Sequence, residues 1–444
     1  MKNVRRCSME RLLLKDLIIW KNNKHRKPLV LQGARQVGKT WLMKEFGRSC
    51  YAKTAYVTFY NNNRMKRVFD ADFDMDRILM NIAAETGMSI TPGDTLIILD
   101  EIQEAPRALE ALKYFCENAP AYHVIAAGSL LGVAIHEGVS YPVGKVDELT
   151  LYPMSFEEFL MAVNETVLCR NLQDKKYEWM KDLKEKYIFW LKNYLYVGGM
   201  PEAVGLFAEQ KDYSAVRKLQ RTIINQYDKD FGKHAKEELR IRISQVWKSV
   251  PAQLSKENKK FFFGNIKKGA RMKDFELAIQ WLADSGLVYR VHRVSKPGKP
   301  LKAYEEIGAF KLYLLDVGLV GAMCNLSSKA LLEGNAAFIE FKGALTENYV
   351  LQELKSMTDY DIFYYSNDDS TFEIDFLVED EEHIIPIEVK AEENLHAKSF
   401  KNYCEKYTPE IAVRTSMSDY REQDWMTNIP LYAISCIKPD SQVQ

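Results

Sequence analysis

The first residues whose types and spacing could do chemistry are Gly33, Gly38, Lys39 and Thr40, which stand in the pattern G-x-x-x-x-G-K-T. This pattern is typical of a loop that binds a polyphosphate, because its backbone N–H groups turn inward and the following helix directs its positive dipole at the same anion. We expect Lys39 to reach the β- and γ-phosphates of ATP and Thr40 to hold Mg²⁺ through its hydroxyl. The predicted nucleotide-binding residues are Gly33, Ala34, Arg35, Gln36, Val37, Gly38, Lys39 and Thr40. A chance match on a surface turn is the alternative.

A pair of carboxylates, Asp100 and Glu101, ends the apolar run 95–99. An apolar run of this kind predicts a strand buried on both faces of a parallel sheet, and such sheets bind ligands at the carboxyl ends of their strands. We therefore predict that Asp100 supports the Mg²⁺ and that Glu101 orients and polarises the water that attacks the γ-phosphate. A further strand, 123–127, is followed by Ser129. Ser129 is placed to sense the γ-phosphate, and a simple Gly-Ser turn is the other interpretation.

A second candidate site lies near the C-terminus and contains Asp375, Glu388 and Lys390. Residues 372–378 and 384–391 have the composition of two strands joined by a charged turn. Because residues two apart in a strand share a face, Glu388 and Lys390 project together, and the hairpin brings Asp375 beside them.

Glu347, on a helix expected over 344–355, could face the same spot. The four residues are similar to the PD-(D/E)XK nuclease arrangement. That resemblance implies that Asp375 and Glu388 bind Mg²⁺, that Glu347 steadies the water shell of the metal, and that Lys390 stabilises the phosphate or positions the water. The alternative is the nuclease fold without its activity, in which these residues form ion pairs in a binding domain.

The elements that must position these residues follow from apolar periodicity and from Gly and Pro. The strand 29–31 precedes the phosphate loop, a helix begins near Lys39, and 56–60 reads as the next strand. Gly198-Gly199 predicts the end of one helix, and Pro201 predicts the start of the next, where a helical lid would begin.

Several runs of sequence resemble a known family, the bacterial and archaeal AAA-type ATPases in which an N-terminal ATPase domain is joined to a C-terminal domain labelled DUF4143. The runs are GARQVGKT at 33–40, LIILDEIQ at 96–103, AAGSLLG at 126–132, LTLYPMSFEEFL at 149–160 and YVGGMPEAV at 196–204. The family often has Gly-Arg before the Leu-Tyr-Pro run, whereas this chain has Gly144-Lys145. An arginine-finger-like role at this position is therefore in doubt, although Lys145 could supply a positive charge.

Charge is unevenly distributed although the chain as a whole has a net charge of zero. Residues 256–302 contain twelve Lys or Arg against four Asp or Glu, a net charge of +8, and residues 359–393 contain thirteen acids against one base, a net charge of −12.

The basic segment also has the order of a winged helix: a helix over 273–284, a strand over 287–294, a turn and a return strand over 301–307. Lys296, Lys299 and Lys302 would then contact DNA phosphates at its tip. The alternatives are a rigid spacer or a protein contact, and the acidic segment suggests a protein partner or a solvated loop.

The length of 444 residues predicts about three domains, and the seven scattered cysteines lack any C-x-x-C pair. We therefore expect reduced thiols, a cytoplasmic location, and neither a membrane span nor a zinc site. The predicted fold class is α/β: a P-loop AAA-type ATPase core at 1–160, a helical lid at 161–235, a winged-helix-like domain at 236–325 and a DUF4143-type nuclease-like domain at 326–444. The predicted function is Mg²⁺-dependent ATP binding and hydrolysis that gates a nucleic-acid-acting C-terminal domain. The alternative is a nucleotide-controlled switch that binds a protein partner.

Overall fold

A computed structural model describes residues 9–128, 131–136, 140–256, 259–331, 336–357, 360–367, 373–393 and 398–437. They divide into two compact units: Arg11–Tyr152 with Asp284–Gly286 form the nucleotide unit, and the remaining described residues form the C-terminal unit. The division falls at Tyr152 and not at the predicted residue 160. The segments predicted as lid, winged helix and nuclease-like domain lie together in the C-terminal unit.

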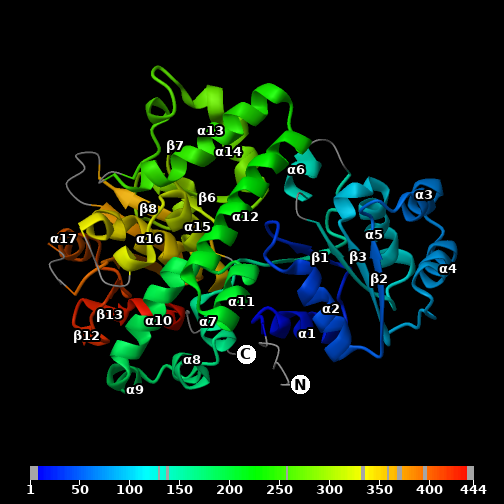
Figure 1. The fold of residues 1–444 in the computed structure, drawn as a ribbon, viewed down its shortest axis with the longest axis horizontal. Helices are drawn as coiled ribbons and strands as arrows, with labels where there is room; N and C mark the ends of the chain where they lie inside the picture. The colour runs from blue at the N-terminus through cyan, green and yellow to red at the C-terminus, as the bar shows by residue number, and fades with distance from the viewer. Residues whose placement is uncertain are drawn as a thin grey trace. The chain divides into compact units, whose positions relative to one another are not determined.

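The nucleotide unit is built on a parallel sheet whose strand order is β2-β3-β4-β1-β5 (Figure 1). The strands are β1 Leu29–Gln32, β2 Lys53–Thr58, β3 Thr95–Asp100, β4 His123–Ala127 and β5 Asp147–Thr150. Every residue of β3 and β4 is buried, as the unbroken apolar runs predicted. Because β4 lies between β1 and β3, Ala127 pairs with both Leu31 and Asp100, so the three strands end at one edge of the sheet.

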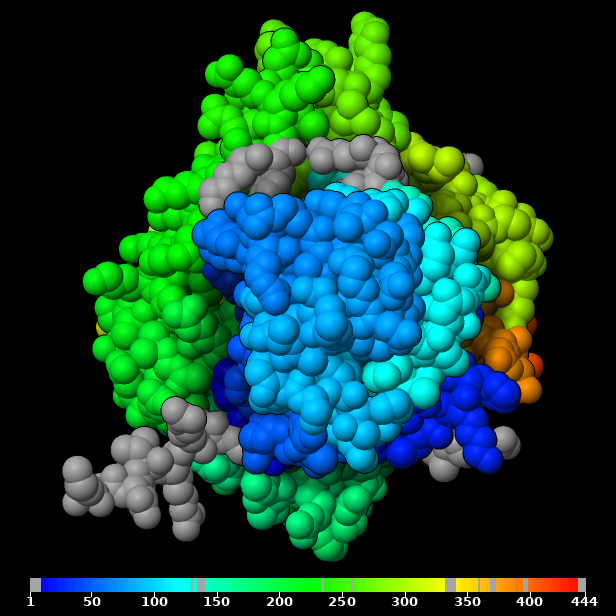
Figure 2. All heavy atoms as spheres, turned by 90° about the vertical axis from the view of Figure 1, so that its right-hand side faces the viewer, coloured from blue at the N-terminus to red at the C-terminus, as the bar shows by residue number. Residues whose placement is uncertain are grey.

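The helices of the nucleotide unit cover this sheet and supply much of its core. They are α1 Leu14–Asn22, α2 Lys39–Cys50, α3 Asn63–Ala71, α4 Met75–Thr86, η1 Ile102–Glu104, α5 Pro106–Asn118 and α6 Leu131–His136. Phe69 of α3, Ile78 of α4 and Leu112 of α5 are fully buried in one apolar cluster with Ile97 and Leu99 of β3. The side of the unit that carries α3 and α4 faces the viewer in Figure 2 as a continuous surface of blue spheres.

The C-terminal unit is built on a mixed sheet whose order is β12-β13-β11-β10-β9-β8-β6-β7. Its strands are β6 Val288–Val294, β7 Glu305–Leu314, β8 Ile362–Ser366, β9 Glu373–Glu379, β10 Ile384–Val389, β11 Val413–Ser416, β12 Arg421–Gln423 and β13 Met426–Pro430. The hairpin of β9 and β10 is the one that the sequence predicted, with Ile387 opposite Phe376. This pairing places the side chains of the second candidate site at the middle of the sheet.

Two successive helices of the C-terminal unit are separated at Gly198, where the sequence predicted a break. The helices of this unit are α7 Phe156–Ala162, α8 Thr166–Gln173, α9 Tyr177–Asp182, α10 Lys184–Val197, α11 Pro201–Gln210, α12 Tyr213–His234, α13 Glu237–Leu254, η2 Phe263–Asn265, α14 Met272–Asp284, η3 Leu301–Tyr304, α15 Val317–Met323, α16 Ala336–Met357, α17 Lys398–Tyr407 and η5 Leu431–Ile437. Gly198 has a positive φ of 75° directly after α10, and Pro201 occupies the first turn of α11. The helix over 344–355 is part of α16.

The strands predicted as a separate winged-helix domain belong instead to the sheet of the C-terminal unit. β6 pairs with β7 on one side and runs parallel to β8 on the other, with His292 opposite Phe363. The return strand begins at Glu305 and not at Leu301, because Leu301–Tyr304 form a 3₁₀ turn. The sequence order helix, strand, turn, strand is the same in both architectures, and only the long-range pairing to β8 separates them.

Two smaller expectations concern thiols and membranes. Within the described parts of the chain, the cysteines are free and form no disulfide. No helix in those parts combines the length and apolar character needed to cross a bilayer.

Candidate functional site

The phosphate loop connects β1 to α2 and depends on two glycines with positive φ. Gly33 has φ 134°, and a Cβ at this position would lie 2.3 Å from the carbonyl oxygen of Leu151. Gly38 has φ 96° and caps the N-terminus of α2. Residues with side chains rarely adopt either conformation, so these positions require glycine. The loop therefore ends at a helix N-terminus whose free N–H groups can meet an anion.

Lys39 lies inside the loop and is 8% exposed. Its Nζ donates to the carbonyl oxygens of Gly33 at 2.6 Å and Ala34 at 2.7 Å. Burial is the main cause that lowers the pKa of Lys39 to about 8, while Glu101 and Asp100 act in the opposite direction. A bound polyphosphate would replace these neutral carbonyls with negative charge.

The phosphate loop and the second carboxylate motif meet at Thr40 and Asp100. Thr40 Oγ1 donates to Asp100 Oδ2 at 2.6 Å, and the hydroxyl of Tyr56, on β2, donates to the same oxygen at 2.9 Å. The Thr40 hydroxyl and the Asp100 carboxylate are hard oxygen donors of the type that Mg²⁺ prefers. These donors thus fit Mg²⁺, and the assignment of Thr40 and Asp100 as its ligands remains a prediction.

Glu101 follows Asp100 in a left-handed conformation, with φ 53°. A residue other than glycine rarely adopts this conformation, and the strain costs on the order of 1 kcal/mol. The carboxylate of Glu101 accepts a hydrogen bond of 2.5 Å from Gln103 Nε2. Gln103 also lies beside the end of β4, since a Cβ on Gly128 would come within 2.4 Å of Gln103 Oε1. Ser129, the predicted γ-phosphate sensor, lies outside the described residues.

Two basic side chains of the nucleotide unit have partners of their own. Arg11 donates to the carbonyl oxygens of Val37 at 2.7 Å and Tyr152 at 2.6 Å, which ties the loop to the end of the unit. Lys145, which stands where the family often has arginine, forms an ion pair of 2.9 Å with Glu117.

The second candidate site is a buried charged cluster, which we define as Lys259, Lys311, Glu347, Asp375, Glu388 and Lys390. The structure brings the four predicted residues into this cluster: Asp375 accepts the N–H of Val389 at 2.8 Å, and Lys390 pairs with Glu388 at 2.5 Å. Glu347 contacts Lys259 and accepts the hydroxyl of Tyr313 at 3.2 Å. Lys311 of β7 lies 4.0 Å from Glu347.

Burial and mutual repulsion govern the protonation of the buried charged cluster. Burial raises the pKa of Asp375 well above its usual range, and Glu347 and Glu388 raise it further. Burial also raises the pKa of Glu388. Burial acts on Glu347 as well, but Lys259 and Lys311 outweigh it and hold the pKa of Glu347 below its usual value. The carboxyls of the cluster thus compete for positive charge, which Lys259, Lys311 and Lys390 supply.

The ion pairs of the buried charged cluster bear on its predicted role as a metal site. Among the described residues, no three His, Cys, Asp or Glu side chains are arranged to hold a metal ion. Glu347 is instead satisfied by Lys259, and Lys311 pairs with Glu373 at 2.5 Å. Metal binding by Glu347, Asp375 and Glu388 remains a prediction.

The basic segment 256–302 offers less free positive charge to a partner than its composition suggests. Arg290 pairs with Glu276 at 2.8 Å, Arg293 with Glu306 at 2.5 Å, and Lys302 with Glu305 at 2.9 Å. Lys299 donates to the carbonyl oxygen of Glu381 at 3.1 Å. Sequence counting missed most of these pairings because Glu305, Glu306 and Glu381 lie outside the basic run, and the β6–β7 pairing brings the first two close.

Sequence reasoning also missed Tyr56, Gln103, Lys259 and Lys311 as parts of the two sites. Gln103 stands within the run LIILDEIQ, so its place in the motif was a usable signal. Tyr56 was visible only as a strand residue, and its contact with Asp100 depends on the pairing of β2 with β3. Lys311 lies on a strand that the sequence assigned to a different domain.

Comparison with protein families supports two of the predicted domains. Residues 25–160 match a family described as AAA domain, and residues 342–434 match a domain of unknown function, DUF4143. Residues 188–330 match another domain of unknown function, DUF8612. The chain thus carries an AAA domain and a DUF4143 domain. A comparison with curated protein sequences gave no match.

Among solved structures, the chain is similar to a Walker-type ATPase of Pyrococcus abyssi, with 12% identity, a TM-score of 0.46, and coverage of 70% of this chain and 94% of that one. It is also similar to the RuvB Holliday junction branch migration motor of Thermotoga maritima, with 12% identity, a TM-score of 0.29, and coverage of 60% and 82%. The third is DnaA from Aquifex aeolicus, bound to AMPPCP, with 11% identity, a TM-score of 0.26, and coverage of 61% and 86%. Likeness at these scores supports no argument about activity.

Proposed function

We propose that the nucleotide unit binds ATP with Mg²⁺ and hydrolyses it. The observation that carries the proposal is the hydrogen bond of 2.6 Å between Thr40 and Asp100, which joins the phosphate loop to the carboxylate strand at one edge of the sheet. Lys39 lies in the same loop with its ammonium directed at backbone carbonyls. Phosphate-loop proteins use these residue types for phosphate and metal, and their joint placement supports that use here.

Each residue has a distinct task in this proposal. Lys39 leaves the carbonyl oxygens of Gly33 and Ala34 and neutralises the β- and γ-phosphates, while the N-terminus of α2 adds its dipole. Thr40 and Asp100 would hold Mg²⁺, which when bound neutralises charge on the β- and γ-phosphate oxygens. Tyr56 keeps Asp100 in position. Glu101 orients the attacking water, and Gln103 holds the Glu101 carboxylate until the nucleotide is in place.

Binding of MgATP to Lys39→Ala, measured by calorimetry, tests the loop assignment. The variant removes a charge-assisted contact to phosphate, so we expect its affinity for MgATP to fall about tenfold to a hundredfold. Lys53→Ala is the matched control, because Lys53 is an exposed lysine on β2 that contacts Ser89. Equal affinities for Lys39→Ala and Lys53→Ala would show that nucleotide binds elsewhere.

We also propose, as a second candidate function, that ATP gates a nucleic-acid-acting C-terminal domain whose site is the buried charged cluster. The convergence of Asp375, Glu388, Glu347 and Lys390 supports it. Incubation with plasmid DNA and Mg²⁺ or Mn²⁺, with and without ATP, tests it against Asp375→Ala. Nicking that is equal in both proteins rules out this site.

The competing candidate is a nucleotide-controlled switch whose cluster is structural and whose C-terminal domain binds a protein. The pairing of Glu347 with Lys259 and of Glu388 with Lys390 favours it, because these lysines already neutralise carboxylates that a metal would need. DNA binding that is absent or insensitive to salt, together with an ATP-dependent protein pull-down, would support the switch.

A further inference from the structure

A polar pocket of about 630 Å³ lies in the C-terminal unit, apart from the buried charged cluster. Its walls come from the first half of α12 and from the turn after α15, which includes Asn325 and Ser328. All the lining residues fall within the segment that matches DUF8612. The ATPase proposal assigns no task to this pocket.

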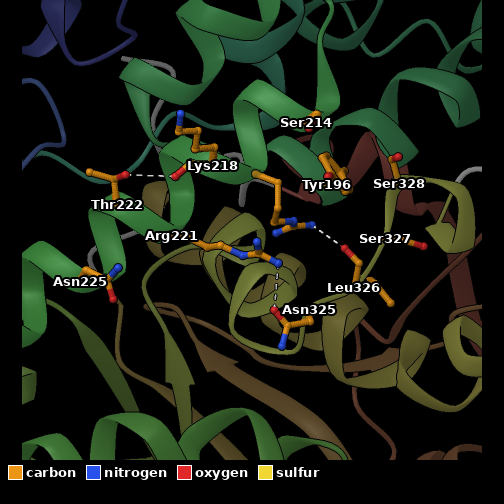
Figure 3. A pocket seen from close by; sticks show the side chains of 11 residues that line it. Tyr196, Ser214, Lys218, Arg221, Thr222, Asn225, Asn325, Leu326, Ser327 and Ser328 are labelled. Carbon is orange, nitrogen blue, oxygen red and sulfur yellow. Dashed lines mark hydrogen bonds between the residues drawn. The ribbon is translucent and has the colours of Figure 1, made fainter.

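The pocket side of α12 presents a regular stripe of side chains. Ser214, Arg217, Lys218 and Arg221 line the pocket at the spacing i, i+3, i+4 and i+7, which puts them on one face of a helix. Figure 3 shows Arg221 extending from α12 to Asn325, to which its Nη2 donates at 3.1 Å. The residues that line the pocket include three basic side chains and no Asp or Glu.

Arg217 is the unusual member of this stripe, because it is 7% exposed and its bonded partners are neutral. Its guanidinium donates to Gln220 Oε1 at 2.8 Å and to the carbonyl oxygens of Gly318 at 3.2 Å and Leu326 at 3.0 Å. Its Nε finds no acceptor in the described part of the chain. A buried cation that has no carboxylate partner among the described residues is costly; the Tyr196 ring, 4.2 Å from the guanidinium carbon, offsets part of this cost, and the charge of Arg221 adds to it.

We propose that this pocket binds a small phosphate-bearing molecule. A multiply charged anion supplies the countercharge that Arg217, Lys218 and Arg221 do not receive from the described residues, and Arg221 can donate to phosphate oxygens from its planar guanidinium. Ser214 and Ser328 add hydroxyl donors to the lining of the pocket. Arg217 contributes its positive charge and not hydrogen bonds, because its Nη groups already donate to neutral oxygens of the protein.

The volume of the site and the placement of its cations favour a small ligand over a polynucleotide. Its volume lies within the range of roughly 300–1,000 Å³ that is usual for small-molecule pockets. Nucleic-acid surfaces instead spread many Lys and Arg contacts along a groove. Here the three cations occupy two turns of one helix, which matches a ligand with one or two phosphate groups.

Calorimetric titration with inorganic pyrophosphate tests the proposal, using full-length Lys39→Ala so that binding at the phosphate loop is suppressed. We expect saturable binding that Arg221→Ala weakens about tenfold or more and Lys218→Ala weakens about threefold. Arg221→Lys keeps the charge and retains part of the affinity. Lys181→Ala, an exposed lysine on α9 that does not line the pocket, leaves the affinity unchanged.

Three results would overturn the proposal. The first is an absence of pyrophosphate binding up to millimolar concentration, and the second is binding that Arg221→Ala and Lys181→Ala affect equally. The third is Arg221-dependent binding of a single- or double-stranded 20-nucleotide DNA without any binding of pyrophosphate, which would assign the pocket to nucleic acid. Because Arg221 is exposed, its variants should fold, and circular dichroism with a urea midpoint equal to that of the parent verifies this.

Discussion

The buried lysine of the phosphate loop makes nucleotide affinity depend on pH in a way that can be worked out in advance. Burial lowers the pKa of Lys39 to about 8 in the free protein. Phosphate oxygens beside its ammonium favour the charged form, so the pKa of Lys39 in the complex is higher. The complex therefore binds more protons than the free protein, and affinity falls as pH rises through the free-protein pKa.

The size of the effect follows from the fraction of free protein that carries charged Lys39. With a pKa of about 8, this fraction falls from about three-quarters at pH 7.5 to about one-tenth at pH 9. We therefore expect the Kd for MgATP to rise about eightfold across this range, in which the phosphates of ATP stay ionised. Proton uptake on binding should approach one proton per nucleotide at pH 9.

Titration calorimetry in two buffers of different ionisation enthalpy measures the Kd and the proton uptake together. Lys39→Arg is the control, because arginine stays charged throughout this range. Its affinity should be lower than that of the parent at pH 7.5 and independent of pH. A flat profile for the parent, or the same decline in Lys39→Arg, would refute the assignment of the titration to Lys39.

Three further perturbations have defined outcomes. Tyr56→Phe removes the hydrogen bond of 2.9 Å to Asp100 and should raise the Mg²⁺ concentration for half-maximal ATP hydrolysis about fivefold, and an unchanged Mg²⁺ dependence would contradict this. Burial raises the pKa of Glu353 from the ordinary 4.5 to about 8. Between these pH values unfolding releases a proton, so the stability of the parent protein falls as pH rises. Glu353→Gln should therefore stabilise the protein against urea at pH 8 and leave its stability nearly unchanged at pH 4.5. Lys259→Met removes the direct ion pair of Glu347, which keeps its contacts with Lys311 and Tyr313, and should lower the free energy of unfolding by about 2–3 kcal/mol. Combining Lys259→Met with Glu347→Gln should recover part of that loss, and a double-mutant cycle measures the recovery.

Local sequence signals predicted the elements of the nucleotide unit that carry the candidate site, because a few neighbouring residues specify each of them. The apolar run before Asp100 became β3, the run 123–127 became β4, and the glycine pattern became the loop before α2. The hairpin that carries Asp375 and Glu388 was also predictable, since alternation and a charged turn specify its register.

The architecture of the C-terminal unit was harder to predict from the sequence, because it depends on pairing between distant segments. Nothing local in 288–314 reveals that β6 lies beside β8, about seventy residues further on. The same limit hid Lys259 and Lys311, whose contacts with Glu347 cross 88 and 36 residues of sequence. The pocket beside α12 had a usable signal in the polar stripe of that helix, but composition alone does not distinguish such a stripe from a solvated helix face.

Steady-state ATP hydrolysis by Glu101→Gln, measured beside nucleotide binding, tests the central claim of an ATPase site most directly. Glu104→Gln is the matched control, because Glu104 belongs to the same 3₁₀ turn and pairs with Lys66 at 3.2 Å. We predict that Glu101→Gln binds MgATP as the parent does and loses hydrolysis by about a hundredfold or more, since general-base catalysis is typically worth 10²–10⁴-fold. Hydrolysis by Glu101→Gln at the parental rate would contradict the claim.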